Sequence, residues 1–190
     1  MKSRKLYRKM FYFIQSLTIF RIFAGPVLFV LISILNNYGL ALAIFFLAAI
    51  SDYFDGYFAR KFNLESSLGA IIDPIADKIL IIFMILAIQI NTGSILVAFL
   101  GSFILAREFW IAALRDLNAS RGLSEVTKVT FLAKLKTTFQ LLALFLYLVY
   151  LNTNNNFIFL IADFVLFAAF LITIKSGLDY TIRSFESSKD

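Results

Sequence analysis

Three long stretches of the chain contain no charged residue, and this feature constrains the fold more than any other. They are Ile22–Ser51, Ile79–Ala106 and Thr137–Ala162. Apolar residues make up 61% of the 190 residues and charged residues 16%, whereas a soluble domain carries about 45–50% and about 25%. Too little polar surface remains to cover a water-soluble core. The sequence therefore excludes a soluble domain, a disordered chain and a coiled coil, and predicts an integral membrane protein.

Clusters of asparagine, glycine and small polar residues divide the apolar stretches at residues 36–39, 91–94 and 152–156. Such clusters are typical of turns and not of helix interiors. A helix needs about 20 apolar residues to cross the bilayer core. We therefore predict an all-α polytopic membrane protein that forms a single domain over residues 1–190. Its six transmembrane helices are expected near residues 17–35, 40–60, 70–90, 95–117, 134–151 and 157–182.

None of the three turns contains lysine or arginine, and all 18 basic residues lie toward the opposite ends of the predicted helices. By the positive-inside rule these ends face the cytoplasm, so both termini are expected to be cytoplasmic. Residues 1–15 are basic and aromatic, and we predict an amphipathic helix there that lies on the cytoplasmic leaflet. The expected location is the inner (cytoplasmic) cell membrane, with any site near the basic ends facing the cytoplasm.

The chain has no cysteine and no histidine. This absence excludes disulfides, the usual zinc sites, thiol nucleophiles and Ser-His-Asp triads. Any chemistry must come from carboxylates, amines, guanidinium groups, hydroxyls and backbone groups, or from a hard metal ion.

A third of the twelve acidic residues lie in one stretch of the chain. Asp52 and Asp55 are three residues apart at the end of the second predicted helix, and Asp73 and Asp77 are four apart at the start of the third. Both spacings place a pair on one helix face, and the short connection allows the two helices to be neighbours. Four carboxylates that meet repel one another unless cations compensate. Lysine or arginine could do so, but ligands that offer only oxygen suit Mg²⁺ or Mn²⁺, and four acids are enough for two ions.

The spacing of these residues resembles the signature of the CDP-alcohol phosphotransferases, also called class I CDP-alcohol phosphatidyltransferases. The matching pattern is Asp52-x2-Asp55-Gly56-x2-Ala59-Arg60-x8-Gly69-x3-Asp73-x3-Asp77. The resemblance implies transfer of a phosphatidyl or similar group from a CDP-linked donor to an alcohol, with release of CMP. It also implies that Asp52, Asp55, Asp73 and Asp77 hold two divalent cations, Mg²⁺ or Mn²⁺, and that Asp77 is the general base. The donor-binding residues that it implies are Gly56, Ala59, Arg60, Gly69 and Thr18.

Four cations bear on the identity of the acceptor. Arg107 and Arg115 are eight residues apart, which returns to nearly the same helix face, and Lys134 and Lys136 lie at the start of the fifth predicted helix. Because all four are expected near one membrane face, they predict a pocket for a phosphate-bearing acceptor. Contact with anionic lipid headgroups is the alternative interpretation.

Within the family, these segments are similar to the branch that uses CDP-diacylglycerol and glycerol 3-phosphate. The similar parts are Asp73-Pro-x-Ala-Asp-Lys78, Arg107-Glu108, and Lys134-x-Lys136-Thr-x-x-Gln140. Ala133 stands where that branch has glycine, and Gln15 where it often has asparagine. The implied product is phosphatidylglycerophosphate, and the implied assembly is a homodimer in the lipid bilayer, with no nucleic acid partner. A cardiolipin synthase of the same fold, with phosphatidylglycerol as acceptor, or another member of the family is the nearest alternative.

An ion transporter is the remaining alternative, because buried acids in a six-helix protein also occur there. Transporter sites usually lie near the bilayer midplane between repeats, whereas these acids and cations lie near one interface and the sequence has no visible repeat. Asp163, inside the sixth predicted helix, is left outside the site; it is expected to bond a neighbouring helix or to reach the outer surface.

Overall fold

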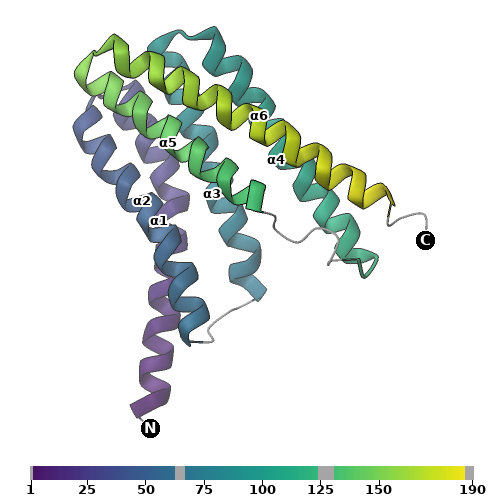
Figure 1. The fold of residues 1–190 in the computed structure, drawn as a ribbon. Helices are drawn as coiled ribbons and strands as arrows, with labels where there is room; N and C mark the ends of the chain where they lie inside the picture. The colour runs from purple at the N-terminus through teal and green to yellow at the C-terminus, as the bar shows by residue number, and fades with distance from the viewer. Residues whose placement is uncertain (1, 63–66, 124–130, 187–190) are drawn as a thin grey trace. The chain divides into compact units, whose positions relative to one another are not determined.

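The structure, a computed structural model, describes residues 2–62, 67–123 and 131–186. These residues form six α-helices (Figure 1). Each helix is long and apolar enough to cross a membrane, which confirms the prediction of an all-α, multi-pass membrane protein. The helices are α1 (Lys2–Ser33), α2 (Tyr38–Phe62), α3 (Ser67–Thr92), α4 (Ile95–Ser120), α5 (Phe131–Thr153) and α6 (Asn156–Glu186).

The three predicted turns are confirmed, and each contains a residue with left-handed backbone geometry. These residues are Asn36 with φ 50°, Gly93 with φ 62° and Asn154 with φ 54°. Glycine adopts this conformation without steric cost, and asparagine tolerates it better than most residues. The polar clusters therefore end one helix and reverse the chain before the next, as their composition indicates.

Helix α1 differs from the prediction at its N-terminal end. It runs without interruption from Lys2 to Ser33, so residues 2–15 are not set apart from the first span by a break near residue 16. The reason is local: no glycine or proline occurs before Gly25, and these are the residues that most often interrupt a helix. The position of residues 2–15 on the cytoplasmic leaflet stays a prediction.

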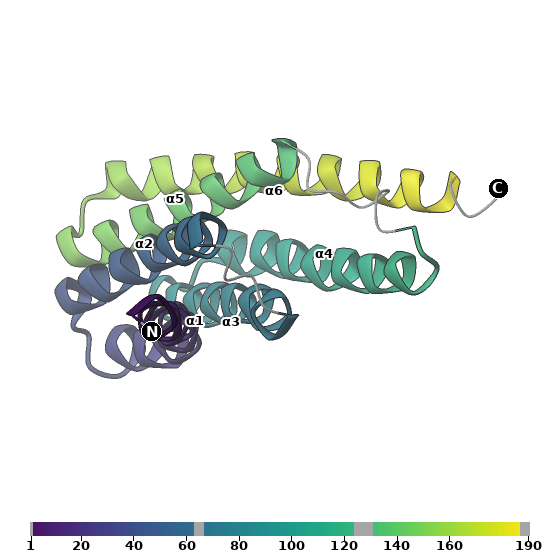
Figure 2. The same cartoon turned by 90° about the horizontal axis from the view of Figure 1, so that it is seen from below.

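The chain divides into two compact units, Met1–Thr92 and Gly93–Asp190. In the first unit α1 packs against both α2 and α3, and in the second unit α6 packs against both α4 and α5. Figures 1 and 2 both show α5 running beside α6. In each unit one helix therefore links the other two, and the single-domain organisation stays a prediction.

Helix α1 approaches α3 closely at Gly25. A Cβ atom on this residue would lie 3.2 Å from the carbonyl oxygen of Ile79 and 3.3 Å from the Cα of Leu80. Small residues allow such close packing between membrane helices, where apolar burial alone gives little driving force. Gly25 is also about one helical turn beyond Arg21, so the close contact helps to hold Arg21 against the first turns of α3.

We expect the substitution Gly25→Val to destabilise the first unit. The new side chain meets backbone atoms of α3, which cannot move aside as a flexible side chain can, and overpacking of this kind costs about 1–3 kcal/mol. Thermal unfolding in detergent checks this. The control is Val27→Ile, which adds a carbon atom at an exposed position of the same helix and should leave the melting temperature unchanged. Equal melting temperatures for Gly25→Val and the wild type would contradict the close packing.

Candidate functional site

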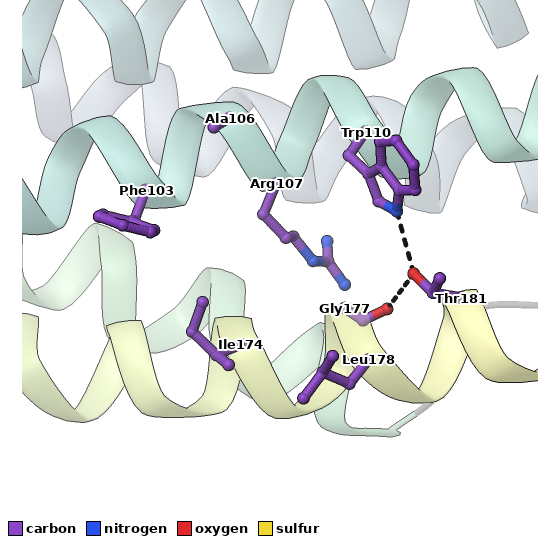
Figure 3. Close-up of a pocket in the computed structure, with 8 residues that line it drawn as sticks. All are labelled: Phe103, Ala106, Arg107, Trp110, Ile174, Gly177, Leu178 and Thr181. Atoms are coloured by element: carbon purple, nitrogen blue, oxygen red, sulfur yellow. Dashed lines mark hydrogen bonds between the residues drawn. The ribbon is translucent and has the colours of Figure 1, made fainter.

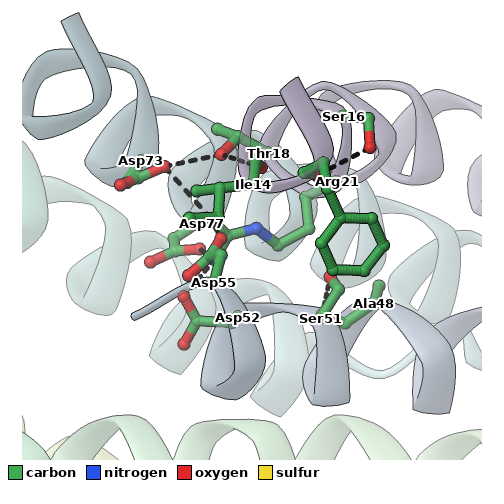
Figure 4. Close-up of polar contacts among 11 residues, drawn as sticks. Ile14, Ser16, Thr18, Arg21, Ala48, Ser51, Asp52, Asp55, Asp73 and Asp77 are labelled. Carbon is green, nitrogen blue, oxygen red and sulfur yellow. Dashed lines mark hydrogen bonds and ion pairs between the residues drawn. The ribbon is translucent and has the colours of Figure 1, made fainter. Parts of the chain in front are cut away.

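The guanidinium group of Arg21 lies where four carboxylates of the first unit converge (Figure 4). Its Nη1 donates to Asp52 and, at 2.8 Å, to Oδ1 of Asp77. Its Nη2 donates to Oδ2 of Asp55 at 2.5 Å and to Oδ1 of Asp73 at 3.4 Å. Arg21 itself is completely buried. One cation among four anions leaves a formal excess of negative charge, so this cluster, which we call the carboxylate cluster, still attracts cations.

The two aspartate pairs meet around Arg21 of α1. They do not meet through the direct packing of α2 on α3 that the sequence predicts. Each of these helices packs against α1, whereas over the described residues the backbones of α2 and α3 do not come close to each other. The hydroxyl of Tyr38 on α2 does donate to Oδ1 of Asn91 on α3 at 3.3 Å. Like charges explain the difference, because four carboxylates on two adjacent helices would repel one another. Placing Arg21 of α1 between the pairs replaces this repulsion by four attractive contacts.

The carboxylate cluster is open on one part and buried on another. The side chain of Asp55 is 6% exposed, whereas those of Asp52, Asp73 and Asp77 are 49%, 42% and 44% exposed. Three carboxylates can therefore meet a ligand, while Asp55 and Arg21 form the buried part of the cluster.

The donor chemistry of the cluster fits a divalent cation such as Mg²⁺ or Mn²⁺. Its ligands are all carboxylate oxygens, which these hard ions prefer, and its excess negative charge favours further positive charge. Within the described ranges, no three acidic side chains are arranged to hold one ion as they stand. These carboxylates point toward Arg21 and bond to it, so their oxygens do not surround a common point that an ion would occupy.

Thr18 joins the carboxylate cluster. Its buried hydroxyl donates to Oδ1 of Asp73 at 2.9 Å, as Figure 4 shows. Gly56 follows Asp55 directly on α2, and Gly69 lies in the first turn of α3; both are partly buried. Ala59 and Arg60 are part of α2, but their side chains lie outside the described residues.

Three of the four cations predicted to bind the acceptor gather in the second unit. The ammonium group of Lys136 donates to Glu108, and Nη1 of Arg107 donates to the same carboxylate at 3.2 Å. The guanidinium groups of Arg107 and Arg115 lie 5.7 and 5.4 Å from the centre of the Tyr180 ring. We call Arg107, Arg115 and Lys136 the cation cluster. Its one anion, Glu108, leaves the cluster with excess positive charge.

Lys134 is not part of the cation cluster as described. It is exposed on α5, and no described contact joins its side chain to the other three cations. The reason is helix geometry: Lys134 and Lys136 are two positions apart on α5, and residues at that spacing do not share a face.

Arg107 also borders a cavity of about 330 Å³ between α4 and α6 (Figure 3). Its Nη2 donates to the hydroxyl of Ser176 at 3.0 Å. A Cβ atom on Gly177 would lie only 3.0 Å from Cγ of Arg107, so this glycine leaves room for the arginine to reach α6. At the far end of the cavity the indole of Trp110 donates to Thr181 at 3.0 Å.

Sequence reasoning missed Arg21 and Glu108 as members of the two clusters. Arg21 does carry a signal, because it is a lone cation inside an apolar stretch and such residues need partners within a membrane protein. Glu108 carries a weaker one, since it lies beside Arg107 on the same helix. Tyr180 has no signal that separates it from the other tyrosines.

The substitution Arg21→Met should strongly destabilise the first unit. It leaves four carboxylates without their shared cation, and removing one partner of a buried ion pair costs about 3–5 kcal/mol. Thermal unfolding in detergent measures the loss. Adding Asp55→Asn should recover part of it, because one repelling charge is then removed. The control Lys61→Met, at an exposed cation on α2, should have little effect. If the double variant lost as much stability as the two single variants lose together, a direct interaction between Arg21 and Asp55 would be contradicted.

Comparisons with known proteins identify the family of the chain. The family model described as CDP-alcohol phosphatidyltransferase matches residues 14–175. A Rickettsia typhi protein named CDP-diacylglycerol–glycerol-3-phosphate 3-phosphatidyltransferase is 39% identical over 170 residues, which cover 86% of this chain and 92% of the relative. Proteins of the same name from Bacillus subtilis and Haemophilus influenzae are 33% and 32% identical; the matches cover 77% and 86% of this chain, and 74% and 88% of the relatives. The chain belongs to the CDP-alcohol phosphatidyltransferase family.

Proposed function

We propose that the chain transfers the phosphatidyl group of CDP-diacylglycerol to glycerol 3-phosphate, forming phosphatidylglycerophosphate and releasing CMP. The observation that carries this proposal is the convergence of Asp52, Asp55, Asp73 and Asp77 on one point of the first unit. The family supplies the reaction class, and the names of the relatives supply this donor and this acceptor.

The family generally depends on divalent metal ions. We propose that this chain uses two, Mg²⁺ or Mn²⁺, held by Asp52, Asp55, Asp73 and Asp77. Such ions, when bound, offset the negative charge of the diphosphate and of the departing CMP. Thr18 supports this role because its hydrogen bond to Asp73 fixes the direction of that carboxylate.

In the proposed reaction a hydroxyl oxygen of the acceptor forms a bond to the phosphorus of the phosphatidyl group, and the bond from that phosphorus to CMP breaks. Asp77 is proposed to take the proton that the hydroxyl loses. Its carboxylate is 44% exposed, so a substrate can reach it. We assign the binding of the substrate CDP-diacylglycerol to Thr18, Gly56, Ala59, Arg60 and Gly69.

The cation cluster is proposed to bind the phosphate of the acceptor. Its positive excess suits an anion, and guanidinium groups offer several donors to phosphate oxygens. Within the described part of the chain, the buried Nε atoms of Arg107 and Arg115 have no hydrogen-bond partner, so both retain a donor for a ligand. The exposed Lys134 adds a further positive charge on α5.

We further propose that the protein resides in the inner cell membrane as a homodimer, with both termini and the site facing the cytoplasm. The distribution of charge supports the orientation, because the basic residues avoid all three of the predicted outer turns.

A panel of acceptors tests the proposed function. Purified protein is incubated with CDP-diacylglycerol, Mg²⁺ and one acceptor, and CMP release is measured. Glycerol 3-phosphate should support release. Phosphatidylglycerol and serine should not, because neither carries the phosphate monoester that the cation cluster is proposed to bind. Inositol phosphate should not either, because the names of the relatives give glycerol 3-phosphate as the acceptor. A chelator should abolish release and added Mg²⁺ or Mn²⁺ should restore it. Activity with phosphatidylglycerol alone would overturn the proposed acceptor.

The variant Asp77→Asn tests the proposed general base. An amide of nearly the same shape cannot take the proton, so kcat for CMP release should fall by about 10²-fold or more. The control is Asp179→Asn, an acid on α6 outside both clusters, which should keep wild-type activity. Wild-type rates in Asp77→Asn would place the base elsewhere.

A further inference from the structure

Gln140 is an amide within the buried, otherwise largely apolar face of α5. It is 2% exposed, and the residues that share this face include Ala143, Leu144 and Leu148. Neither its Oε1 nor its Nε2 has a hydrogen-bond partner among the described residues. A buried amide with both polar atoms unpaired destabilises a protein. The position therefore calls for a partner that the described chain does not supply.

One member of the cation cluster, Lys136, lies one helical turn away from this amide. Gln140 follows Lys136 by four residues on α5, and residues at that spacing are neighbours on one face, with their Cβ atoms about 5–6 Å apart. Lys136 is itself buried and bonds to Glu108, which also accepts from Arg107. A ligand whose anionic end meets the cation cluster could therefore reach the amide with the part of the molecule next to that end.

The amide selects the chemistry of its partner. A glutamine side chain offers an oxygen that accepts and an NH₂ group that donates. A phosphate or carboxylate only accepts, and would leave the oxygen of Gln140 unpaired. An alcohol hydroxyl both donates and accepts, so one hydroxyl can satisfy both atoms. The combination of adjacent cations and this amide matches a small phosphate monoester with a hydroxyl on a nearby carbon.

We propose that Gln140 binds the hydroxyl of glycerol 3-phosphate that does not react, and thereby sets selectivity for this acceptor. The inference rests on the proposed function and goes beyond it by assigning a specificity-determining residue. Sites that hydrogen-bond a substrate hydroxyl discriminate strongly against analogues that lack it, because the polar group of the protein is then left unpaired. The ribose hydroxyls of the donor are the other source of the same chemistry.

The experiment compares two acceptors, glycerol 3-phosphate and 3-hydroxypropyl phosphate, which lacks only the middle hydroxyl. Values of kcat/KM for CMP release are measured with the wild type, with Gln140→Met and with Thr138→Val. The wild type should prefer glycerol 3-phosphate by about tenfold or more. Gln140→Met should reduce this preference to about threefold or less, because only the reaction with glycerol 3-phosphate loses a hydrogen bond. Thr138→Val, at an exposed position of α5, should keep the wild-type preference.

A second measurement uses the thermal stability of the purified protein without substrates. Methionine has nearly the length of glutamine but buries no unpaired amide, so Gln140→Met should raise the melting temperature. A lower melting temperature would mean that the amide has a partner inside the protein, and would overturn the inference.

The kinetic outcomes separate this inference from the proposed function. If glycerol 3-phosphate supports no CMP release in the wild type, the proposed function fails and this inference fails with it. If glycerol 3-phosphate is an acceptor but Gln140→Met slows both acceptors equally, or keeps the wild-type preference, only the inference is overturned. A raised KM for CDP-diacylglycerol with unchanged acceptor preference would assign Gln140 to the donor, and would also overturn it.

Discussion

A single buried guanidinium group that four carboxylates share is the interaction on which the first unit depends. Arg21 of α1 contacts two acids on α2 and two on α3, so the three helices cannot separate without exposing charge to an apolar environment. Burying an ion is costly unless its partners are well placed. The four carboxylates engage both terminal nitrogens of Arg21, whereas its Nε has no partner among the described residues. The same contacts keep the carboxylates together, and the proposed chemistry needs them together.

The second unit has the opposite electrostatic character. There, Arg107 and Lys136 both bond to Glu108, the guanidinium group of Arg115 lies near the Tyr180 ring, and Arg107 reaches α6 through the space that Gly177 leaves. The first unit is thus suited to hold positive ions and the second to hold a negative group. This division matches a reaction with a cation-dependent diphosphate donor and a phosphorylated acceptor, and each unit achieves it with few charged residues in an apolar surrounding.

The sequence predicts the elements of this protein well because the membrane leaves few alternatives. Charge-free stretches must be spans, and Asn36, Gly93 and Asn154 mark the turns between them. Residue spacing predicts that each aspartate pair shares a face, but it does not reveal that α1 lies between the pairs, because packing order is a tertiary property. The continuity of α1 before Gly25 has a local origin: basic composition indicates contact with lipid headgroups, but this part of the helix contains no glycine or proline that would separate it from the span.

Asp163 shows what sequence can and cannot decide about a buried acid. The structure pairs it with the hydroxyl of Tyr147 on α5, which donates at 2.5 Å, so of the two predicted alternatives the bond to a neighbouring helix is the one that forms. Nothing in the sequence separates Tyr147 from Tyr150, the other tyrosine of α5, as the partner.

One face of α1 carries Thr18, Arg21 and Gly25, which lie three and four residues apart in succession. Thr18 fixes the carboxylate of an aspartate, Arg21 is shared by four aspartates, and Gly25 allows α3 to come close. Because each residue turns an α-helix by about 100°, one inserted residue within this segment would point part of the face toward lipid. The number of residues between Thr18 and Gly25 is therefore fixed by geometry. Residues added or lost before Thr18 would leave the directions of the three side chains relative to one another unchanged, so the length of that part of α1 is less constrained.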